Sequence, residues 1–244
     1  MASTFVNNLR LEEMNTGEQS GEWGTKTNTN LELVGEALGF GTEAITTNAN
    51  THATTVADAS SDAGRAIYII YTGTLDSACT ITIGPDTLKR VHIIKNGTSG
   101  SQNILIKQGA GAGAAVTIPP GDTKVVSLDG AGSGAIVTDV YASLSVVDLK
   151  VQDDLSLTSD SAVVSFGVDA DTTLTHTDGS GLTLNSTNKL MFNDASQFIQ
   201  GASATVLDIA ATDTIELTAT NIAVVGTMGA TGKITADAGI DIDN

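Results

Sequence analysis

Three aspartates in the stretch GVDADTTLTHTDGSG are the residues of this 244-residue sequence best suited to chemistry. Asp169, Asp171 and Asp178 could hold Ca²⁺, or two of them could act as acid and base on a glycosidic bond, because both chemistries use neighbouring carboxylates. The stretch lacks the D-x-[DN]-x-[DN]-G frame of an EF-hand loop. We therefore favour the other interpretation, that these residues form acidic turns exposed to solvent.

The remaining nucleophiles and imidazoles form no recognisable catalytic or metal-binding pattern. The sequence has no G-x-S-x-G elbow, no P-loop lysine and no H-E-x-x-H motif. His52, His92 and His176 fall in different predicted modules, which disfavours a two-histidine metal site within one chain. Cys79 is the only cysteine, so there is no intrachain disulfide, and its apolar surroundings are typical of a buried thiol. We expect no enzyme activity, no cofactor and no metal.

Charge is distributed unevenly along the chain, whose net charge is −17. Residues 1–60 carry two basic and eight acidic side chains, residues 61–150 carry seven of each, and residues 151–244 carry two basic and thirteen acidic ones. This partition indicates three structural modules. A chain without a basic stripe is a poor partner for nucleic acid. The N-terminus lacks the pattern of a signal peptide, and no apolar run is long enough to predict membrane insertion.

The residue pattern predicts a mainly β chain. Residues 1–45 are expected to form an N-terminal attachment segment that contains a short helix, and residues 46–64, which are small and polar, a connection. Residues 65–147 contain β-branched runs separated by Gly and Pro turns, which predict a small antiparallel β-sandwich. Residues 148–244 are expected to form a repetitive trimeric β-stalk.

The short helix is predicted from three apolar residues, Leu31, Val34 and Leu38, whose i, i+3, i+7 spacing marks one helix face. Thr29 stands three residues before Glu32, which is the spacing of a capping box, and glycines follow Leu38. These signals predict a helix of about ten residues, which is marginal in isolation. We therefore expect it to dock on another surface.

The stalk is predicted from apolar residues that recur in pairs separated by one residue. One strand of this kind has only two inward side chains and cannot bury them alone. Three chains around one axis would provide a continuous core, whereas a single-chain β-solenoid, the alternative, usually needs longer rungs. The pairs are Leu149/Val151, Leu155/Leu157, Val164/Phe166, Leu182/Leu184, Leu190/Phe192, Leu207/Ile209, Ile215/Leu217 and Ile222/Val224.

The stalk core is expected on the threefold axis. Leu174, Leu182, Leu190, Phe198 and Val206 are each eight residues apart, which indicates a regular register. The predicted trimer core comprises Phe166, Leu174, Leu182, Leu184, Leu190, Phe192, Phe198, Ile215 and Leu217. His176 takes the place of the second apolar residue after Leu174, so three imidazoles could meet on the axis and bind a metal or an anion. The alternative is a neutral histidine packed in the core.

Three stretches of the sequence together resemble tailed-phage fibre proteins. GEQSGEWGTKTNTNLELVGEAL resembles the N-terminal segment of many phage fibre and tail proteins, which carries a G-x-W-G-x-x-x-N-x-N-L pattern. VHIIKNGTSGSQNILIKQGAGAGAAVTIPPGDTKVVSLDGAGSGAIV looks like a small β-module of the same fibres, and LMFNDASQFIQGASATVLDIAATDTIELTAT is similar to stalk repeats of marine-phage fibres. The residues that match the first pattern are Gly21, Trp23, Gly24, Asn28, Asn30 and Leu31.

The resemblance covers most of the chain except residues 41–64. It implies a structural protein of the virion tail that assembles as a homotrimer, with the N-terminus on the tail and the C-terminus outward. Because the sequence ends at GIDIDN within a repeat-like stretch, without an aromatic-rich tip or a self-cleaving chaperone domain, we expect a fragment, a proximal segment, or a chain whose distal partner is another fibre protein or a host receptor.

The expected function is therefore a trimeric tail fibre that attaches to a phage tail, baseplate or adaptor protein and projects toward the host for adsorption. A polysaccharide-binding or polysaccharide-degrading tailspike is the alternative, although 4% aromatic residues and short repeats disfavour a sugar groove. A bacterial surface adhesin is a second alternative, disfavoured by the absence of a signal peptide. A large aromatic residue in an apolar patch is a usual hot spot of an interface. The predicted attachment interface comprises Trp23, Asn28, Asn30, Leu31, Val34 and Leu38.

Overall fold

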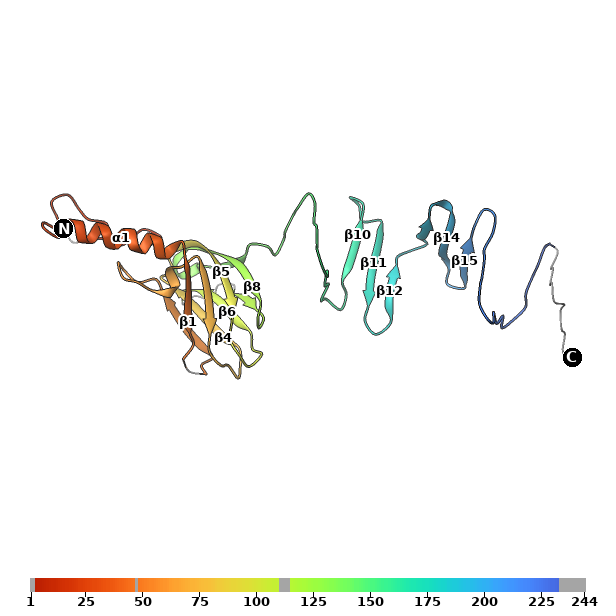
Figure 1. Ribbon diagram of the computed structural model, residues 1–244, viewed down its shortest axis with the longest axis horizontal. Coiled ribbons are helices and arrows are strands. Elements are labelled where there is room, and N and C mark those ends of the chain that lie inside the picture. Colours follow the sequence, from red (N-terminus) through yellow and green to blue (C-terminus); the bar gives the residue numbers. More distant parts are fainter. Residues whose placement is uncertain (1–2, 47, 110–114, 233–244) are drawn as a thin grey trace. The chain divides into compact units, whose positions relative to one another are not determined.

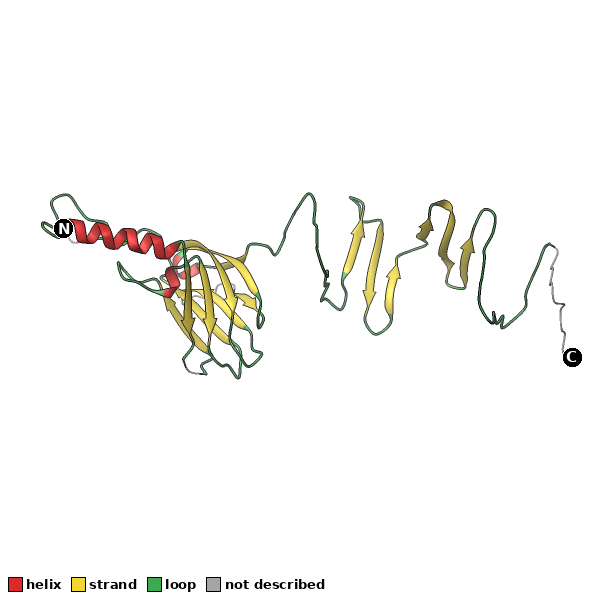
Figure 2. Ribbon diagram, viewed as in Figure 1, coloured by secondary structure: helices red, strands yellow, loops and turns green. Residues whose placement is uncertain are grey.

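The computed structural model describes residues 3–46, 48–109 and 115–232 and divides the chain into two compact units, Met1–Leu149 and Lys150–Asn244. We refer to them as the N-terminal unit and the C-terminal unit. As predicted, the chain is mainly β, with one N-terminal helix and several small sheets (Figures 1 and 2).

The helix α1 spans Trp23–Ala37, so it is longer than predicted and begins six residues before Thr29. Glu22 precedes its first turn without a side-chain cap, and the predicted capping box at Thr29 is wrong because Thr29 lies inside the helix. The first half of the helix, WGTKTNTN, contains glycine, threonine and asparagine, which have low helix propensity. Contacts with the rest of the N-terminal unit therefore have to stabilise this half, and sequence propensity could not reveal them.

The N-terminal unit contains two β-sheets. The first follows the order β1-β3-β5-β8-β9, and the second follows the order β2-β4-β6-β7. The strands of the first sheet are β1 (Phe40–Ala44), β3 (Tyr68–Thr72), β5 (Lys89–Asn96), β8 (Thr123–Asp129) and β9 (Val137–Asp139). Those of the second are β2 (Thr51–Thr55), β4 (Cys79–Gly84), β6 (Ile104–Gln108) and β7 (Val116–Ile118).

The two sheets are mixed, which corrects the predicted antiparallel sandwich. The chain alternates between the sheets from β1 to β6, so β1, β3 and β5 run parallel in one sheet and β2, β4 and β6 run parallel in the other. Only β7, β8 and β9 join by antiparallel pairing. The first six strands thus make three successive coils, in which a strand of the opposite sheet replaces the usual crossover helix. Apolar alternation and turn residues predict strands but not the direction of their neighbours.

The segment 46–64, predicted to be a connection, contains β2 and the short 3₁₀ helix η1 (Ala63–Arg65), so that prediction is wrong. The strand β2 was not predicted because its residues, THATT, are small or polar and show no apolar alternation. Thr54 points inward and is buried, and its hydroxyl lies 2.8 Å from the Tyr71 hydroxyl of β3 in the opposite sheet. Because β1 also belongs to a sheet, the predicted attachment segment and the sandwich share one fold.

The core of the N-terminal unit lies between its two sheets. Ile69 and Ile94 point inward from the first sheet, Ile81 and Ile106 from the second, and all four are fully buried. Cys79 belongs to the same core, as predicted, and burial raises the pKa of its thiol. Alternating burial along β4 reflects the period of two in its sequence.

The C-terminal unit contains two separate three-stranded antiparallel sheets. Four predicted pairs, Val164/Phe166, Leu182/Leu184, Leu190/Phe192 and Leu207/Ile209, lie in strands. The pairs at 149/151, 155/157, 215/217 and 222/224 lie outside the strands of the described residues. Residues 233–244 of the predicted stalk lie outside the described residues. The strands are β10 (Val163–Phe166), β11 (Thr172–Thr177) and β12 (Gly181–Leu184), then β13 (Lys189–Phe192), β14 (Asp194–Ser203) and β15 (Val206–Ala210).

One end of the N-terminal core is polar. His92 of β5 faces inward beside Ile94 and is fully buried. Its Nδ1 lies 2.9 Å from the Ala66 carbonyl oxygen, which can only accept, so Nδ1 carries the hydrogen. Burial, with a smaller effect of the Arg90 guanidinium, lowers the pKa of His92 from 6.5 to about 4. His92 is therefore neutral at pH 7.

The buried imidazole predicts acid sensitivity of the N-terminal unit. Between pH 6.5 and 4 the unfolded chain binds a proton at this residue that the folded chain does not, so the free energy of unfolding should fall as the pH is lowered, by about 3 kcal/mol. Urea unfolding followed at several pH values in this range should show a smaller decrease for His92→Gln than for the unmodified chain. Equal decreases in both would contradict the assignment.

Candidate attachment and assembly surfaces

Helix α1 has two adjacent faces with different environments. Leu33 and Ala37 are buried against the N-terminal unit. Trp23, Leu31 and Leu38 are 62%, 64% and 76% exposed. Because each helical residue advances by about 100°, Trp23, Leu31, Leu38 and the half-buried Val34 fall within about 80° of one another.

We call Trp23, Leu31, Val34 and Leu38 the helix stripe. It lies beside the buried face, and the exposure of Trp23, Leu31 and Leu38 leaves these three largely open to solvent among the residues that the structure describes. Isolated exposed apolar residues are common, but a large aromatic grouped with aliphatic side chains on one face is typical of a binding surface. The stripe contains four of the six residues predicted to form the attachment interface, and what it binds stays a prediction.

Asn30 has an intramolecular role that sequence reasoning missed. Its side-chain oxygen accepts a hydrogen bond from the Glu12 backbone N–H (3.0 Å), and its amide nitrogen donates to the Glu12 carbonyl oxygen (2.9 Å). Lys26 adds an ion pair of 3.1 Å with the buried Glu12 carboxylate. Asn30 and Lys26 thus hold the N-terminal segment against α1, whereas Asn28 is exposed. No sequence signal could have identified a main-chain partner eighteen residues away.

The sheet β10-β11-β12 has one apolar face and one hydroxyl-rich face. Val164 pairs with Leu174, and Leu174 pairs with Leu184, so these three side chains form a row across the sheet. His176 and Leu182 form the next row on the same face, because alternate residues of a strand share a face. The opposite face carries Ser165, Thr173, Thr175, Thr177 and Thr183.

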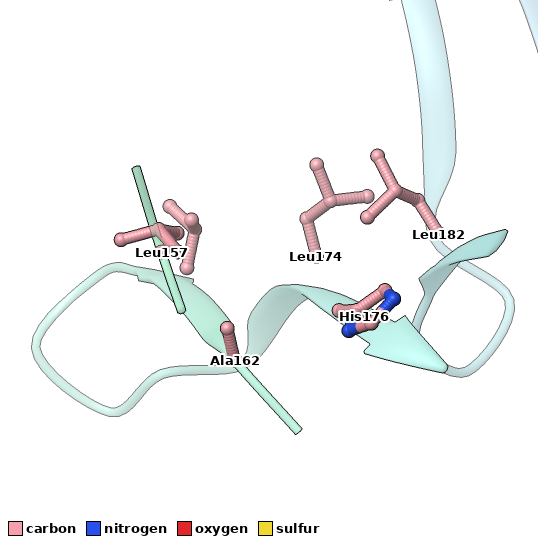
Figure 3. Close-up of a pocket in the computed structure, with 6 residues that line it drawn as sticks. Leu157, Ala162, Leu174, His176 and Leu182 are labelled. Carbon is pink, nitrogen blue, oxygen red and sulfur yellow. The ribbon is translucent and has the colours of Figure 1, made fainter. Parts of the chain in front are cut away.

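A hollow of about 320 Å³ lies on the apolar face (Figure 3). His176 supplies the only polar side chain in this lining, and its backbone N–H donates to the Ala162 carbonyl oxygen at 2.8 Å. His176 therefore shares the apolar face with its neighbours, as its alignment with the pairs predicted. Whether three copies of it meet on an axis stays a prediction. The hollow is lined by Leu157, Ala162, Val164, Leu174, His176 and Leu182.

The sheet β13-β14-β15 corrects the predicted position of Phe198. Leu190, Ile199 and Ile209 form a row on one face, whereas Phe198 pairs with Met191 on the other face. The register between β13 and β14 shifts between Met191 and Phe192, so the eight-residue spacing does not keep Leu190 and Phe198 on one face. The Lys189 ammonium covers the Phe198 ring at 3.6 Å from its centroid. Phe198 therefore does not share a face with Leu190.

The other predicted core residues of the C-terminal unit remain accessible in the single chain. Leu174 and Leu184 are half-buried. None of residues 150–232 is buried, so this part of the unit has no core of its own. Whether other chains cover these side chains stays a prediction. Those that are exposed are Phe166, Leu182, Leu190 and Phe192 within strands, and Ile215 and Leu217 outside them.

The acidic turns form no metal centre within the described part of the chain. Asp169 and Asp171 both place a carboxylate oxygen near Gly167, which adopts a φ of +82° in the turn between β10 and β11. Both side chains are exposed. Among the residues described, no group of three or more His, Cys, Asp or Glu side chains is placed to hold a metal ion. No helix in residues 3–46, 48–109 and 115–232 is long and apolar enough to cross a membrane.

Comparison with family models, with curated proteins and with solved structures gives no match to this chain.

Removal of the Asn30 side chain should release the N-terminal segment from α1. We expect Asn30→Ala to speed limited proteolysis within residues 3–22 several-fold, because the Glu12 backbone loses both of its side-chain hydrogen bonds. Asn28→Ala is the matched control, since Asn28 is exposed on the same helix. Equal cleavage rates of the two variants, measured by mass spectrometry of the fragments, would show that the segment is held by other contacts.

Proposed function

We propose that the chain is a subunit of a trimeric tail fibre of a tailed phage, with a structural and not an enzymatic role. The observation that carries the proposal is the C-terminal unit, in which single-layer sheets expose an apolar face and none of residues 150–232 is buried. Such a unit gains stability when its apolar faces are covered. In this proposal, other copies of the same chain cover them.

The size of the apolar face supports an assembly of defined geometry. The face of β10-β11-β12 presents Val164, Phe166, Leu174, Leu182 and Leu184, and the next sheet presents a similar row. Full burial of each such side chain stabilises by about 1.5–3 kcal/mol. Coverage of one face by identical chains therefore offsets part of the cost of ordering the strands, and a closed arrangement of three also protects the sheet edges.

Charge also bears on the choice of partner. Residues 151–244 carry thirteen acidic and two basic side chains, so identical stalks repel one another, and burial of their apolar faces has to outweigh this repulsion. The hydroxyl-rich face of β10-β11-β12 suits contact with water. An apolar face turned inward and a hydrated, acidic exterior together favour a slender soluble fibre. Salt screens the repulsion and should strengthen the assembly.

The N-terminal unit supplies the attachment function in this proposal. It has its own core, so it can fold independently of the coverage that the C-terminal unit needs. The helix stripe then docks on a tail, baseplate or adaptor protein of the virion. The resemblance of residues 17–38 to the N-terminal segments of phage fibres supports this assignment. The action is mechanical, in that the fibre links the tail to a more distal fibre protein or host receptor.

Self-association through the apolar face is tested by charge placed on opposite faces of β11. The full-length chain should have a solution mass three times its 24.8 kDa, measured by light scattering. Leu174→Asp should reduce the mass to that of one chain, because it puts a carboxylate in the covered face. Thr175→Asp, one residue along on the other face, should remain a trimer. A monomeric unmodified chain, or equal effects of both substitutions, would overturn the proposal.

Attachment through the helix stripe is tested in virions made from the genome that encodes the chain. We expect Trp23→Ala to remain trimeric but to be reduced at least tenfold in purified particles, as measured by quantitative mass spectrometry. Glu32→Ala, an exposed residue of the same helix outside the stripe, is the control. Absence of the unmodified chain from virions would refute the fibre assignment, and normal incorporation of Trp23→Ala would refute the stripe.

A further inference from the structure

The apolar face of β10-β11-β12 has different features at its two ends. Phe166 lies at one end, opposite Thr172, and its side chain is 52% exposed. The hollow lies at the other end, around His176 and Leu182. Val164 and Leu174 form the row next to Phe166 and line the near side of the hollow. A single sheet thus carries a protruding ring and a recess on the same face, displaced from each other along the strands.

The hollow suits a side chain better than a free ligand. Its volume of about 320 Å³ is at the low end of the range for small-molecule pockets, and its lining is apolar apart from His176. An aromatic ring buries about 150–250 Å² and prefers apolar contacts, with its edge toward another ring or a polar group. Phe166 is the one exposed aromatic residue on this face of the described sheet.

The Phe166 ring lies far from the Leu182 end of the hollow in its own chain. Phe166 belongs to β10 and Leu182 to β12, and β11 lies between them. Neighbouring strands are about 4.8 Å apart, so β10 and β12 are about 10 Å apart, and the two residues are in addition four positions apart along the strand direction, which is about 13 Å. The part of the hollow that Leu182 lines is therefore beyond the reach of Phe166 of the same chain.

We propose that Phe166 of one chain inserts into the hollow of a second copy, and that three such contacts close the trimer. This inference rests on the proposed self-association. Here each copy uses one patch, Phe166, to bind a different patch, the hollow, on the next copy. Such contacts close into a ring when a rotation brings Phe166 of each copy to the hollow of the next one. Strands perpendicular to the fibre axis would meet this condition. The Phe166 end of each sheet would then face the hollow end of the neighbouring sheet at the same height along the axis. His176 lines the receiving site and contacts the inserted ring.

Disulfide cross-linking tests the direction of the contact. The variant Phe166→Cys with Leu182→Cys should give covalent trimers on a denaturing gel after mild oxidation, since each chain offers one cysteine to each neighbour. A disulfide within one chain is excluded because it requires Cα atoms within about 7 Å. The native Cys79 is fully buried and should not react. The control is Phe166→Cys with Thr183→Cys, which places the second thiol on the opposite face.

The outcomes separate this inference from the proposed function. Covalent trimers from the first variant alone support insertion of Phe166 into the hollow. Covalent dimers only, or no cross-links in a chain whose solution mass is still trimeric, would overturn the inference and leave self-association intact. A monomeric mass of the unmodified chain would overturn both.

A truncation gives an independent measurement. Phe166→Ala should raise the dissociation constant of the trimer at least tenfold, whereas Val163→Ala, on the opposite face of the same strand, should change it less than threefold. Sedimentation at a series of concentrations measures both. Equal effects of the two substitutions would also contradict the insertion.

Discussion

The structure depends on one constraint, which is that a single-layer β-sheet cannot bury its own apolar face. In the N-terminal unit each sheet covers the other, and side chains such as Ile81 and Ile94 become fully buried. In the C-terminal unit no second layer exists within residues 150–232, and side chains of the same type stay accessible. The same alternation of residues therefore produces a folded core in one unit and an accessible apolar face in the other.

The N-terminal unit solves this constraint by a coiled path. Because the chain alternates between the sheets from β1 to β6, each coil places one strand in each layer and buries a few side chains from both. The antiparallel strands β7 to β9 then complete the two sheets. Helix α1 packs Leu33 and Ala37 on this unit and leaves its apolar stripe accessible. A buried core and an exposed apolar stripe therefore coexist in one unit.

Sequence patterns predicted the elements of this fold better than their arrangement. The period of two located most strands and placed His176 on the apolar face with Leu174, because alternation is a local property. Strand direction, the role of β2 and the partner of Asn30 depend on residues distant in the sequence, and no local pattern records them. The eight-residue spacing did not put Phe198 on the face of Leu190, because Leu190 pairs with Ile199 and Phe198 pairs with Met191.

The register shift near Met191 shows that a small irregularity in a strand changes which residues face each side of the sheet. The same effect limits where residues can be inserted into the C-terminal unit. Insertion of one residue within β11 would move Leu174 and His176 to the hydroxyl-rich face and Thr175 to the apolar face, so all later contacts of that strand would be exchanged. An insertion in a turn, or of two residues in a strand, avoids this exchange. Descendants of this chain should therefore tolerate insertions and deletions mainly in turns or in even steps, and the spacing of their apolar residues should record that restriction.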